Sequence, residues 1–334
     1  MDMMQKYPRI SDMVAPAERK LPKFVHAYLA AGTGIGQAMS RNEQALSEVE
    51  LMPRFLRGRV APDTSLELFG QHYAAPFGIA PVGLQSLIWP NGEALLAKAA
   101  SAHQIPYTLS TVAGADLETI GPIAGDMAWY QLYAPSDKAV MRDLLKRAKA
   151  AGFKTLVVTV DVPGPSRREE MRLAGAPIGS RNPMALTPRV FWQCMTHPSW
   201  SLAALANGGK FSFKNLVRYN KEGDGDDITT FIGRQLNGSL TWDYLAEIRA
   251  EWDGPLVVKG ILHLEDARQA LKAGADALVI SNHGGRQLDA APPSITILPQ
   301  IRQALGNDIK LFFDSGVRSG LDIARALASG ADFV

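Results

Sequence analysis

Residues 255–282 have the sequence PLVVKGILHLEDARQALKAGADALVISN, in which two short apolar runs flank one helical pattern. The runs begin at Pro255 and Ala277 and are rich in the β-branched residues that favour strands. Between them, residues 264–274 place apolar side chains at helical spacing and finish at Gly274, which suits the end of a helix. The stretch therefore predicts one strand–helix–strand unit with parallel strands.

The same unit recurs along most of the chain. Most strand-like runs start about 20–35 residues apart, the length of one strand plus one helix. Eight units predict an α/β fold, a (β/α)8 TIM barrel, and a doubly wound sheet is the alternative. The eight runs begin at Phe77, Tyr107, Ala128, Thr155, Pro255, Ala277, Lys310 and Ala331.

One interval and the end of the chain depart from this regular pattern. About 70 residues are inserted after the fourth run, on the strand-to-helix side where barrel active sites form. We expect residues 1–334 to form a single barrel, with a lid or interaction loop inserted at about residues 175–240; a solvated loop without a role is the alternative. Val334 falls inside the eighth run, so we expect a barrel truncated within strand 8, with helix 8 and the tail absent.

Composition excludes several classes of protein. The 35 basic and 33 acidic residues give a net charge of +2 without a basic cluster, so nucleic acid is not an expected partner. The single cysteine, Cys194, excludes internal disulfides and Cys-rich zinc sites. The acidic run at 222–227 lacks the spacing of a calcium loop, so no metal is expected. Because no signal peptide or membrane span is recognisable, we expect a cytoplasmic enzyme.

Polar residues and glycines gather where the apolar runs end. Active sites of TIM barrels form at the carboxyl ends of the strands, so these positions predict the site. Its most informative stretch is SNHGGRQLD, residues 281–289. There His283 offers a base and Arg286 a clamp for a carboxylate, and two glycines allow close approach of the backbone. Of the six histidines, His283 alone follows a predicted strand.

The SNHGGRQLD stretch resembles the signature of the FMN-dependent α-hydroxy acid oxidase and dehydrogenase family. The similarity extends from Leu21 to Val334, with several motifs in the order of the family. It implies FMN as cofactor and oxidation of a small (S)-2-hydroxy acid, lactate-like or mandelate-like, to the 2-oxo acid. The alternatives are a non-catalytic or regulatory flavin-binding barrel and an unrelated phosphate-binding lyase.

The resemblance also assigns catalytic and substrate-binding roles. It makes His283 the base, which takes a proton from the α-carbon or from the hydroxyl, and Asp161 its carboxylate partner. Catalytic and substrate-binding residues in the resemblance are Tyr28, Tyr133, Arg168 and Arg286, with Gly83 and Val112 beside the substrate side chain. Because the last two are small, we expect room for substrates larger than glycolate.

The resemblance further implies a flavin site. A lysine, Lys259, lies near flavin N1, where a fixed cation tunes the electronics of the ring. The phosphate and ribityl chain fall on the segment after the seventh run. The cofactor-binding residues are Ala80, Pro81, Val82, Ser110, Gln131, Thr159, Lys259, Ser281, Asp314, Ser315, Gly316 and Arg318.

Partners follow from the same resemblance. The electron acceptor is oxygen, a quinone or a carrier protein, and the assembly is a homotetramer. In the insertion, Phe191, Trp192 and Trp200 either contact a membrane, as in some relatives, or pack over the mouth of the barrel. The protein would then be peripheral at the inner face of the membrane. The glycine-rich residues 32–36 weakly resemble a dinucleotide loop, but no strand precedes them, so we expect an ordinary loop.

Overall fold

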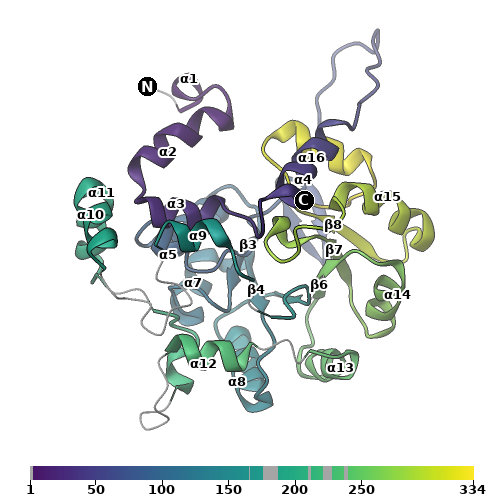
Figure 1. Ribbon diagram of the computed structural model, residues 1–334. Helices are drawn as coiled ribbons and strands as arrows, with labels where there is room; N and C mark the ends of the chain where they lie inside the picture. Colours follow the sequence, from purple (N-terminus) through teal and green to yellow (C-terminus); the bar gives the residue numbers. More distant parts are fainter. Residues whose placement is uncertain (1–2, 165, 176–186, 210–211, 221–227, 237–239) are drawn as a thin grey trace.

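The computed structural model describes residues 3–164, 166–175, 187–209, 212–220, 228–236 and 240–334. Within these ranges a parallel sheet runs in sequence order at the centre of the molecule, with helices around it (Figure 1). Its strands are β3 (Tyr107–Ser110), β4 (Ala128–Leu132), β5 (Thr155–Thr159), β6 (Leu256–Ile261), β7 (Ala277–Ile280) and β8 (Lys310–Phe313).

The two remaining runs close the sheet into a barrel. Ile79 forms a parallel bridge with β3, and Phe333 forms one with β8. The amide of Gly78 then donates to the carbonyl of Val334 at 2.9 Å, joining the first run to the last. The predicted (β/α)8 TIM barrel is therefore confirmed, although its first and last strands contribute only bridges.

A helix follows the first run and each of the strands β3 to β8, as the pattern predicts. These outer helices are α6 (Gly92–Ala102), α7 (Leu117–Ala124), α8 (Lys138–Ala150), α13 (Trp242–Glu251), α14 (Leu264–Lys272), α15 (Ser294–Leu305) and α16 (Gly320–Ala328). Short 3-10 turns lie at η2 (Gly125–Met127) and η4 (His283–Gly285).

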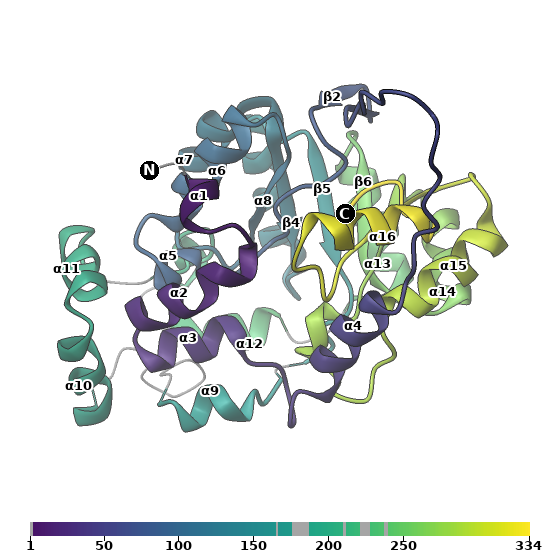
Figure 2. The ribbon, with the colours of Figure 1, turned by 90° about the horizontal axis from the view of Figure 1, so that it is seen from above.

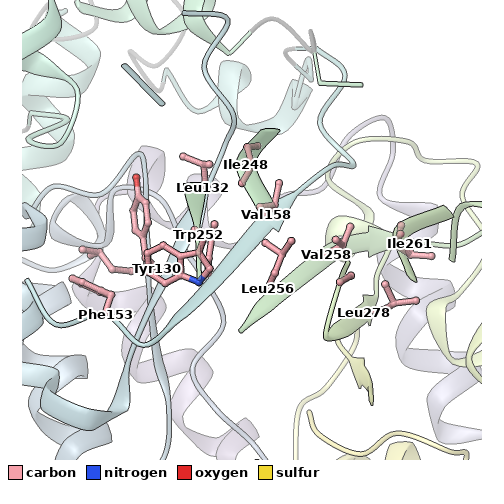
Figure 3. Close-up of a cluster of buried hydrophobic side chains, with 14 of the residues drawn as sticks. Tyr130, Leu132, Phe153, Val158, Ile248, Trp252, Leu256, Val258, Ile261 and Leu278 are labelled. Carbon is pink, nitrogen blue, oxygen red and sulfur yellow. The ribbon is translucent and has the colours of Figure 1, made fainter. Parts of the chain in front are cut away.

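Side chains alternate between two layers because successive residues of a strand face opposite sides. In β5, Val157 belongs to the cluster inside the barrel, whereas Leu156 and Val158 belong to the cluster under the helices. Figure 3 shows this outer cluster, where Trp252 at the end of α13 lies among the strand residues. Each fully buried side chain of this size stabilises the fold by about 1.5–3 kcal/mol. Burial on both faces explains why the strands are continuous apolar runs.

A β-hairpin packs against the interior of the barrel. Strands β1 (Leu66–Leu68) and β2 (Gln71–Tyr73) pair antiparallel, and their Leu68 and Tyr73 join the inner cluster. The Nε1 of Trp129 donates to the hydroxyl of Tyr73 at 3.1 Å. Sequence reasoning missed this hairpin, because three-residue strands carry little periodic signal.

The helices before the first run, and one short helix after it, complete the molecule. They are α1 (Met3–Lys6), η1 (Ile10–Met13), α2 (Val14–Lys20), α3 (Lys23–Ala30), α4 (Gln37–Ser47) and α5 (Gln85–Ile88). Residues 32–36 form a turn before α4, as expected, and Gly36 caps that helix with φ +78°.

The insertion between β5 and α13 is partly helical. It contains α9 (Glu169–Leu173), α10 (Pro188–Thr196), α11 (Pro198–Ala206), η3 (Val217–Tyr219) and α12 (Ile228–Gln235). Helices α10 and α11 lie side by side at the periphery in both views (Figures 1 and 2). The acidic run at 222–227 lies outside the described residues.

Trp200 of α11 does not have the exposure that a membrane contact requires. Only 3% of it is exposed, and its indole Nε1 donates to the carbonyls of Leu87 and Ile88 at 3.2 Å. Its ring meets Phe24 edge-on at 5.8 Å. The sequence could not separate this inward tryptophan from exposed Trp192, because the two helices were not recognised.

Candidate active site

A cavity of about 510 Å³ opens at the carboxyl ends of the strands. Its size lies within the range typical of ligand sites, about 300–1,000 Å³. The predicted site residues among its lining are Tyr28, Ala80, Pro81, Val82, Gly83, Val112, Tyr133, Thr159, Arg168, Lys259, His283, Arg286, Asp314, Ser315, Gly316 and Arg318. Residues from distant parts of the sequence therefore meet where the barrel places its site.

His283 and Asp161 form a hydrogen-bonded pair at this cavity. The Nδ1 of His283 lies 2.8 Å from Oδ1 of Asp161, and both side chains are largely buried. The carboxylate accepts the Nδ1 proton, which leaves Nε2 with a free lone pair. His283 is thereby oriented as a proton acceptor toward the cavity that it lines.

Glycine makes room for Asp161 on the neighbouring strand. Gly260 interrupts the register between β6 and β7 and has φ +110°. A Cβ at this position would lie 2.5 Å from Cβ and Cγ of Asp161, far inside contact distance. The bulge at Gly260 therefore permits the aspartate to reach the histidine.

Two partly buried arginines meet the end of helix α3. The guanidinium of Arg286 donates to the carbonyl of Leu29 at 2.8 Å, and that of Arg168 donates to the carbonyls of Tyr28 and Ala31. Burial lowers the pKa of both arginines. The Nε of Arg168 is buried and has no hydrogen-bond partner. Spare donors of two cations at one cavity suit an anionic substrate group.

Two tyrosines complete this side of the cavity. The hydroxyl of Tyr28 donates to the carbonyl of Gly83 at 2.8 Å, and the Arg168 guanidinium lies 5.1 Å from the centre of its ring. Tyr133 comes directly after β4 and also lines the cavity. Burial raises the pKa of both hydroxyls, so both stay protonated and act as hydrogen-bond donors at neutral pH.

A largely buried ion pair lines the cavity. The Nζ of Lys259 is 2.7 Å from Oδ2 of Asp314 and donates to the hydroxyl of Ser281 at 3.1 Å. Burial alone would lower the pKa of Lys259, but the charges of Asp314 and Asp161 raise it above its usual value. Burial alone would likewise raise the pKa of Asp314, yet Lys259 holds it below its usual value. Lys259 therefore supplies a permanent positive charge at the cavity.

Unpaired polar atoms lie at the ends of strands β4 and β5. The Nε2 of Gln131 and the Oγ1 of Thr159 are buried without a hydrogen-bond partner. Ser110 donates to Oε1 of Gln131 at 2.8 Å, which fixes the amide and leaves Nε2 as the free donor. Because buried polar groups are normally hydrogen-bonded, these atoms are suited to a polar ligand edge.

The loop after β8 forms another wall of the cavity. Ser315 and Gly316 have φ +86° and +93°, and Gly316 packs against the backbone of Asn42. The guanidinium of Arg318 forms an ion pair with Glu43 at 2.8 Å. The loop precedes the N-terminus of α16, where backbone amides favour an anion.

Four predicted residues do not line the cavity: Asp161, Ser110, Gln131 and Ser281. They contact residues that do, or each other, as described above. Sequence reasoning missed several lining residues, among them Met39, Asn42, Phe77, Phe313 and Val317. Only Asn42 carried a signal: it is a polar residue in the stripe formed with Ala38 and Leu46 at a spacing of four.

Comparisons with known proteins agree on one family. Residues 17–334 match a family model described as FMN-dependent dehydrogenase. The chain is 43% identical over 325 residues to L-lactate dehydrogenase of Ectopseudomonas mendocina (strain ymp), covering 97% of this chain and 84% of that protein. The L-lactate dehydrogenase of Vibrio parahaemolyticus serotype O3:K6 (strain RIMD 2210633) is 41% identical, with 96% and 84% covered.

Two solved structures of 2-hydroxy acid enzymes, one a dehydrogenase and one an oxidase, have a similar fold. The monotopic membrane protein (S)-mandelate dehydrogenase superposes with a TM-score of 0.90 at 31% identity, covering 98% of this chain and 85% of the other. Mandelate oxidase superposes with a TM-score of 0.78 at 35% identity, covering 98% and 84%.

Proposed function

This chain belongs to the FMN-dependent dehydrogenase family, and from that premise we propose that it oxidises an (S)-2-hydroxy acid, lactate-like or mandelate-like, to the 2-oxo acid. The observation that carries this proposal is the His283–Asp161 pair, whose histidine lines the same cavity as two partly buried arginines. A base beside an anion clamp is the arrangement that this reaction requires.

The residues present fit FMN. Lys259 supplies the cation that suits the N1 side of the ring, and the unpaired Gln131 Nε2 and Thr159 Oγ1 supply donors for its polar edge. Residues 80–82 line the cavity, and their backbone would hold the ring. Residues 314–318, before the N-terminus of α16, would hold the phosphate. FMN, when bound, supplies a two-electron acceptor beside the α-carbon of the substrate.

The other steps belong to side chains of the protein. Arg286 and Arg168 hold the substrate carboxylate, with Tyr28 as a further donor. Tyr133 donates to the substrate hydroxyl. His283 Nε2 takes the proton, from the α-carbon or from the hydroxyl, and Asp161 stabilises the imidazolium that forms. Burial of these groups strengthens each interaction by excluding water.

Oxidation of L-lactate, (S)-mandelate and glycolate by the FMN-loaded protein tests this function. We expect pyruvate from lactate or benzoylformate from mandelate in the presence of an acceptor dye. Absence of a 2-oxo acid from all three substrates would exclude the proposal. Parallel assays with air, a quinone and a dye as sole acceptor separate an oxidase from a dehydrogenase.

Gly83 is proposed to set the size of the substrate. A Cβ at Gly83 would lie 2.8 Å from Cγ2 of Val112 and 3.2 Å from the hydroxyl of Tyr28. We expect Gly83→Ala to lower kcat/KM for (S)-mandelate relative to L-lactate by about 10–200-fold, the usual effect of one methyl group in a pocket. The ratio of the two kcat/KM values is the measurement. Equal losses for both substrates would place Gly83 away from the substrate side chain.

Helices α10 and α11 are proposed to contact a membrane surface. Among the described residues no helix is long and apolar enough to cross a bilayer. Phe191, Trp192 and Met195 of α10 and Leu202 and Leu205 of α11 are nevertheless more than half exposed. Such a patch on peripheral helices suits the interface of a bilayer, where aromatic rings are favoured. This part of the insertion would place the enzyme at the inner face of the membrane.

Vesicle binding tests this contact. Each apolar side chain moved from water into the bilayer contributes about 1.5–3 kcal/mol, so we expect Phe191→Ser with Trp192→Ser to weaken co-sedimentation at least tenfold. Leu95→Ser is the matched control, because Leu95 is exposed on the outer helix α6. Equal sedimentation of both variants with wild type would overturn the proposal.

A homotetramer remains our prediction for the assembly. Residues 50–65 extend from the body as an exposed arm (Figure 1). Its Met52, Phe55 and Leu56 are almost fully exposed. Apolar side chains on such an arm suit a contact with a second copy of this chain.

A further inference from the structure

Asn42 and Asn282 form a reciprocal amide pair between helix α4 and the loop of the candidate base. Asn42 Nδ2 donates to Asn282 Oδ1 at 2.8 Å, and Asn282 Nδ2 donates back to Asn42 Oδ1 at 2.7 Å. The two residues are 2% and 4% exposed, and 240 positions separate them in the sequence. Asn42 lies in the buried stripe of α4 between Ala38 and Leu46.

Every hydrogen-bonding position of the Asn282 amide is used. Besides the pair with Asn42, its Oδ1 accepts from the amide of Gly285 at 3.2 Å and its Nδ2 donates to the carbonyl of Pro292 at 3.0 Å. The Gly285 amide needs an acceptor and the Pro292 carbonyl needs a donor, so they determine where the oxygen and the nitrogen of the Asn282 side chain lie. The side-chain amide of Asn42 matches that arrangement and stabilises it against rotation by 180°.

The loop that this amide supports has an unfavourable backbone. His283, Gly284 and Gly285 all have positive φ, at +56°, +62° and +70°. For the histidine this left-handed conformation is unfavourable and persists only where surrounding contacts impose it. The amide of Gly285 donates to Asn282 Oδ1, and this hydrogen bond closes the turn over residues 283–285 and stabilises its left-handed backbone.

Helix α4 also braces the loop after β8. A Cβ at Gly316 would lie 2.9 Å from the backbone carbon and oxygen of Asn42. The hydroxyl of Ser315 in that loop accepts from the amides of Asn282 and Gly284, at 3.4 and 3.1 Å. The loop at residues 282–285, which carries His283, and the loop at residues 314–318 are thus packed against each other and against Asn42 of α4.

We propose that Asn42 is a positioning residue for proton abstraction, acting through Asn282 to hold His283 in its reactive orientation. The inference rests on the proposed role of His283 as base. Asn42 lines the cavity, but both ends of its side-chain amide are bonded to Asn282. Misplacement of a reacting group by about 1 Å can lower a rate by about 100-fold, so a fixed loop matters for turnover.

Asn42→Asp is the most direct test, because it keeps the shape and replaces the donor Nδ2 with an oxygen that faces Asn282 Oδ1. We expect kcat to fall by about 10–100-fold, the usual effect of losing a hydrogen bond that supports an active-site residue from behind. The isotope effect with α-deuterated substrate rises, while KM and the binding of the 2-oxo acid product stay close to wild type. Gln44→Glu makes the same amide-to-acid change on the exposed face of α4 and should leave all four unchanged.

A double-mutant cycle gives a second variant should Asn42→Asp fail to fold. Asn42→Ala combined with Asn282→Ala should be no slower than Asn282→Ala alone, because both act through one contact. Additive losses would contradict action through Asn282. A merely structural role would lower Tm and the folded fraction without changing the isotope effect per bound flavin.

Hydrogen exchange supplies a readout independent of activity. In Asn42→Asp, the peptide that contains residues 283–285 should exchange faster than in wild type, with the outer helices unchanged. Unchanged exchange together with a wild-type isotope effect would overturn the inference. A wild-type protein that oxidises no 2-hydroxy acid would instead refute the proposed function, while the exchange result would still report on the Asn42 contact.

Discussion

Replacing His283 with asparagine lowers the rate of substrate oxidation by about 100- to 10,000-fold, the range expected for loss of a general base. Asparagine suits this position because it tolerates the left-handed backbone found at φ +56°. The variant keeps its yellow flavin, since the groups that fit FMN lie on other segments. The rate of flavin bleaching after anaerobic mixing with substrate is the measurement.

Two further variants make the result specific. Asp161→Asn leaves the imidazole in place but removes the carboxylate that accepts its Nδ1 proton, so we expect a large loss there as well. His103→Asn is the matched control at an exposed histidine and should behave as wild type. A colourless His283 variant would indicate a structural role, and an unimpaired one would exclude His283 as the base.

Lys259→Met is expected to have the second large effect. It leaves the Asp314 carboxylate largely buried beside an apolar side chain, and breaking a buried ion pair in this way costs about 3–5 kcal/mol. The cation that we propose near flavin N1 is lost with it, so we expect cofactor affinity to fall too. Denaturant unfolding and FMN titration measure the two losses separately.

The double variant Lys259→Met with Asp314→Asn distinguishes these losses. This variant replaces the Asp314 carboxylate, which has lost its partner Lys259, with a neutral amide. It should recover most of the free energy of unfolding, but it should not recover the reduction of flavin by substrate. Because the pKa of Asp314 is held low in the fold, the wild-type contribution is present above the ordinary carboxyl range and is lost as pH falls. Equal free energies of unfolding for wild type and Lys259→Met would show that the Lys259–Asp314 ion pair does not stabilise the fold.

The barrel could be predicted because its strands are buried on both faces. Continuous apolar runs such as 155–159 and 277–280 need no partner to be recognised, and parallel strands require the helices found between them. The carboxyl ends of such strands converge, so Asp161 and His283, 122 positions apart, were expected at one site. Their 2.8 Å contact follows from the fold.

The segment before the barrel could not be predicted in the same way. The contacts of α3 and α4 with the site depend on where whole helices pack, which no local pattern encodes. Tyr28 came only from the family resemblance, and Asn42 was missed altogether. The sequence left open whether Trp200 contacts a membrane or packs over the mouth of the barrel, because its orientation depends on contacts with Phe24 and the α5 carbonyls.

Anaerobic mixing of the FMN-loaded protein with the two enantiomers of lactate and of mandelate tests the central claim most directly. The account predicts that the flavin absorbance bleaches with an (S)-2-hydroxy acid and not with its (R)-enantiomer. Arg286, Tyr133 and His283 line one cavity, and we propose that they fix the substrate on one face. Unchanged absorbance with every 2-hydroxy acid, in protein shown to contain FMN, would contradict it.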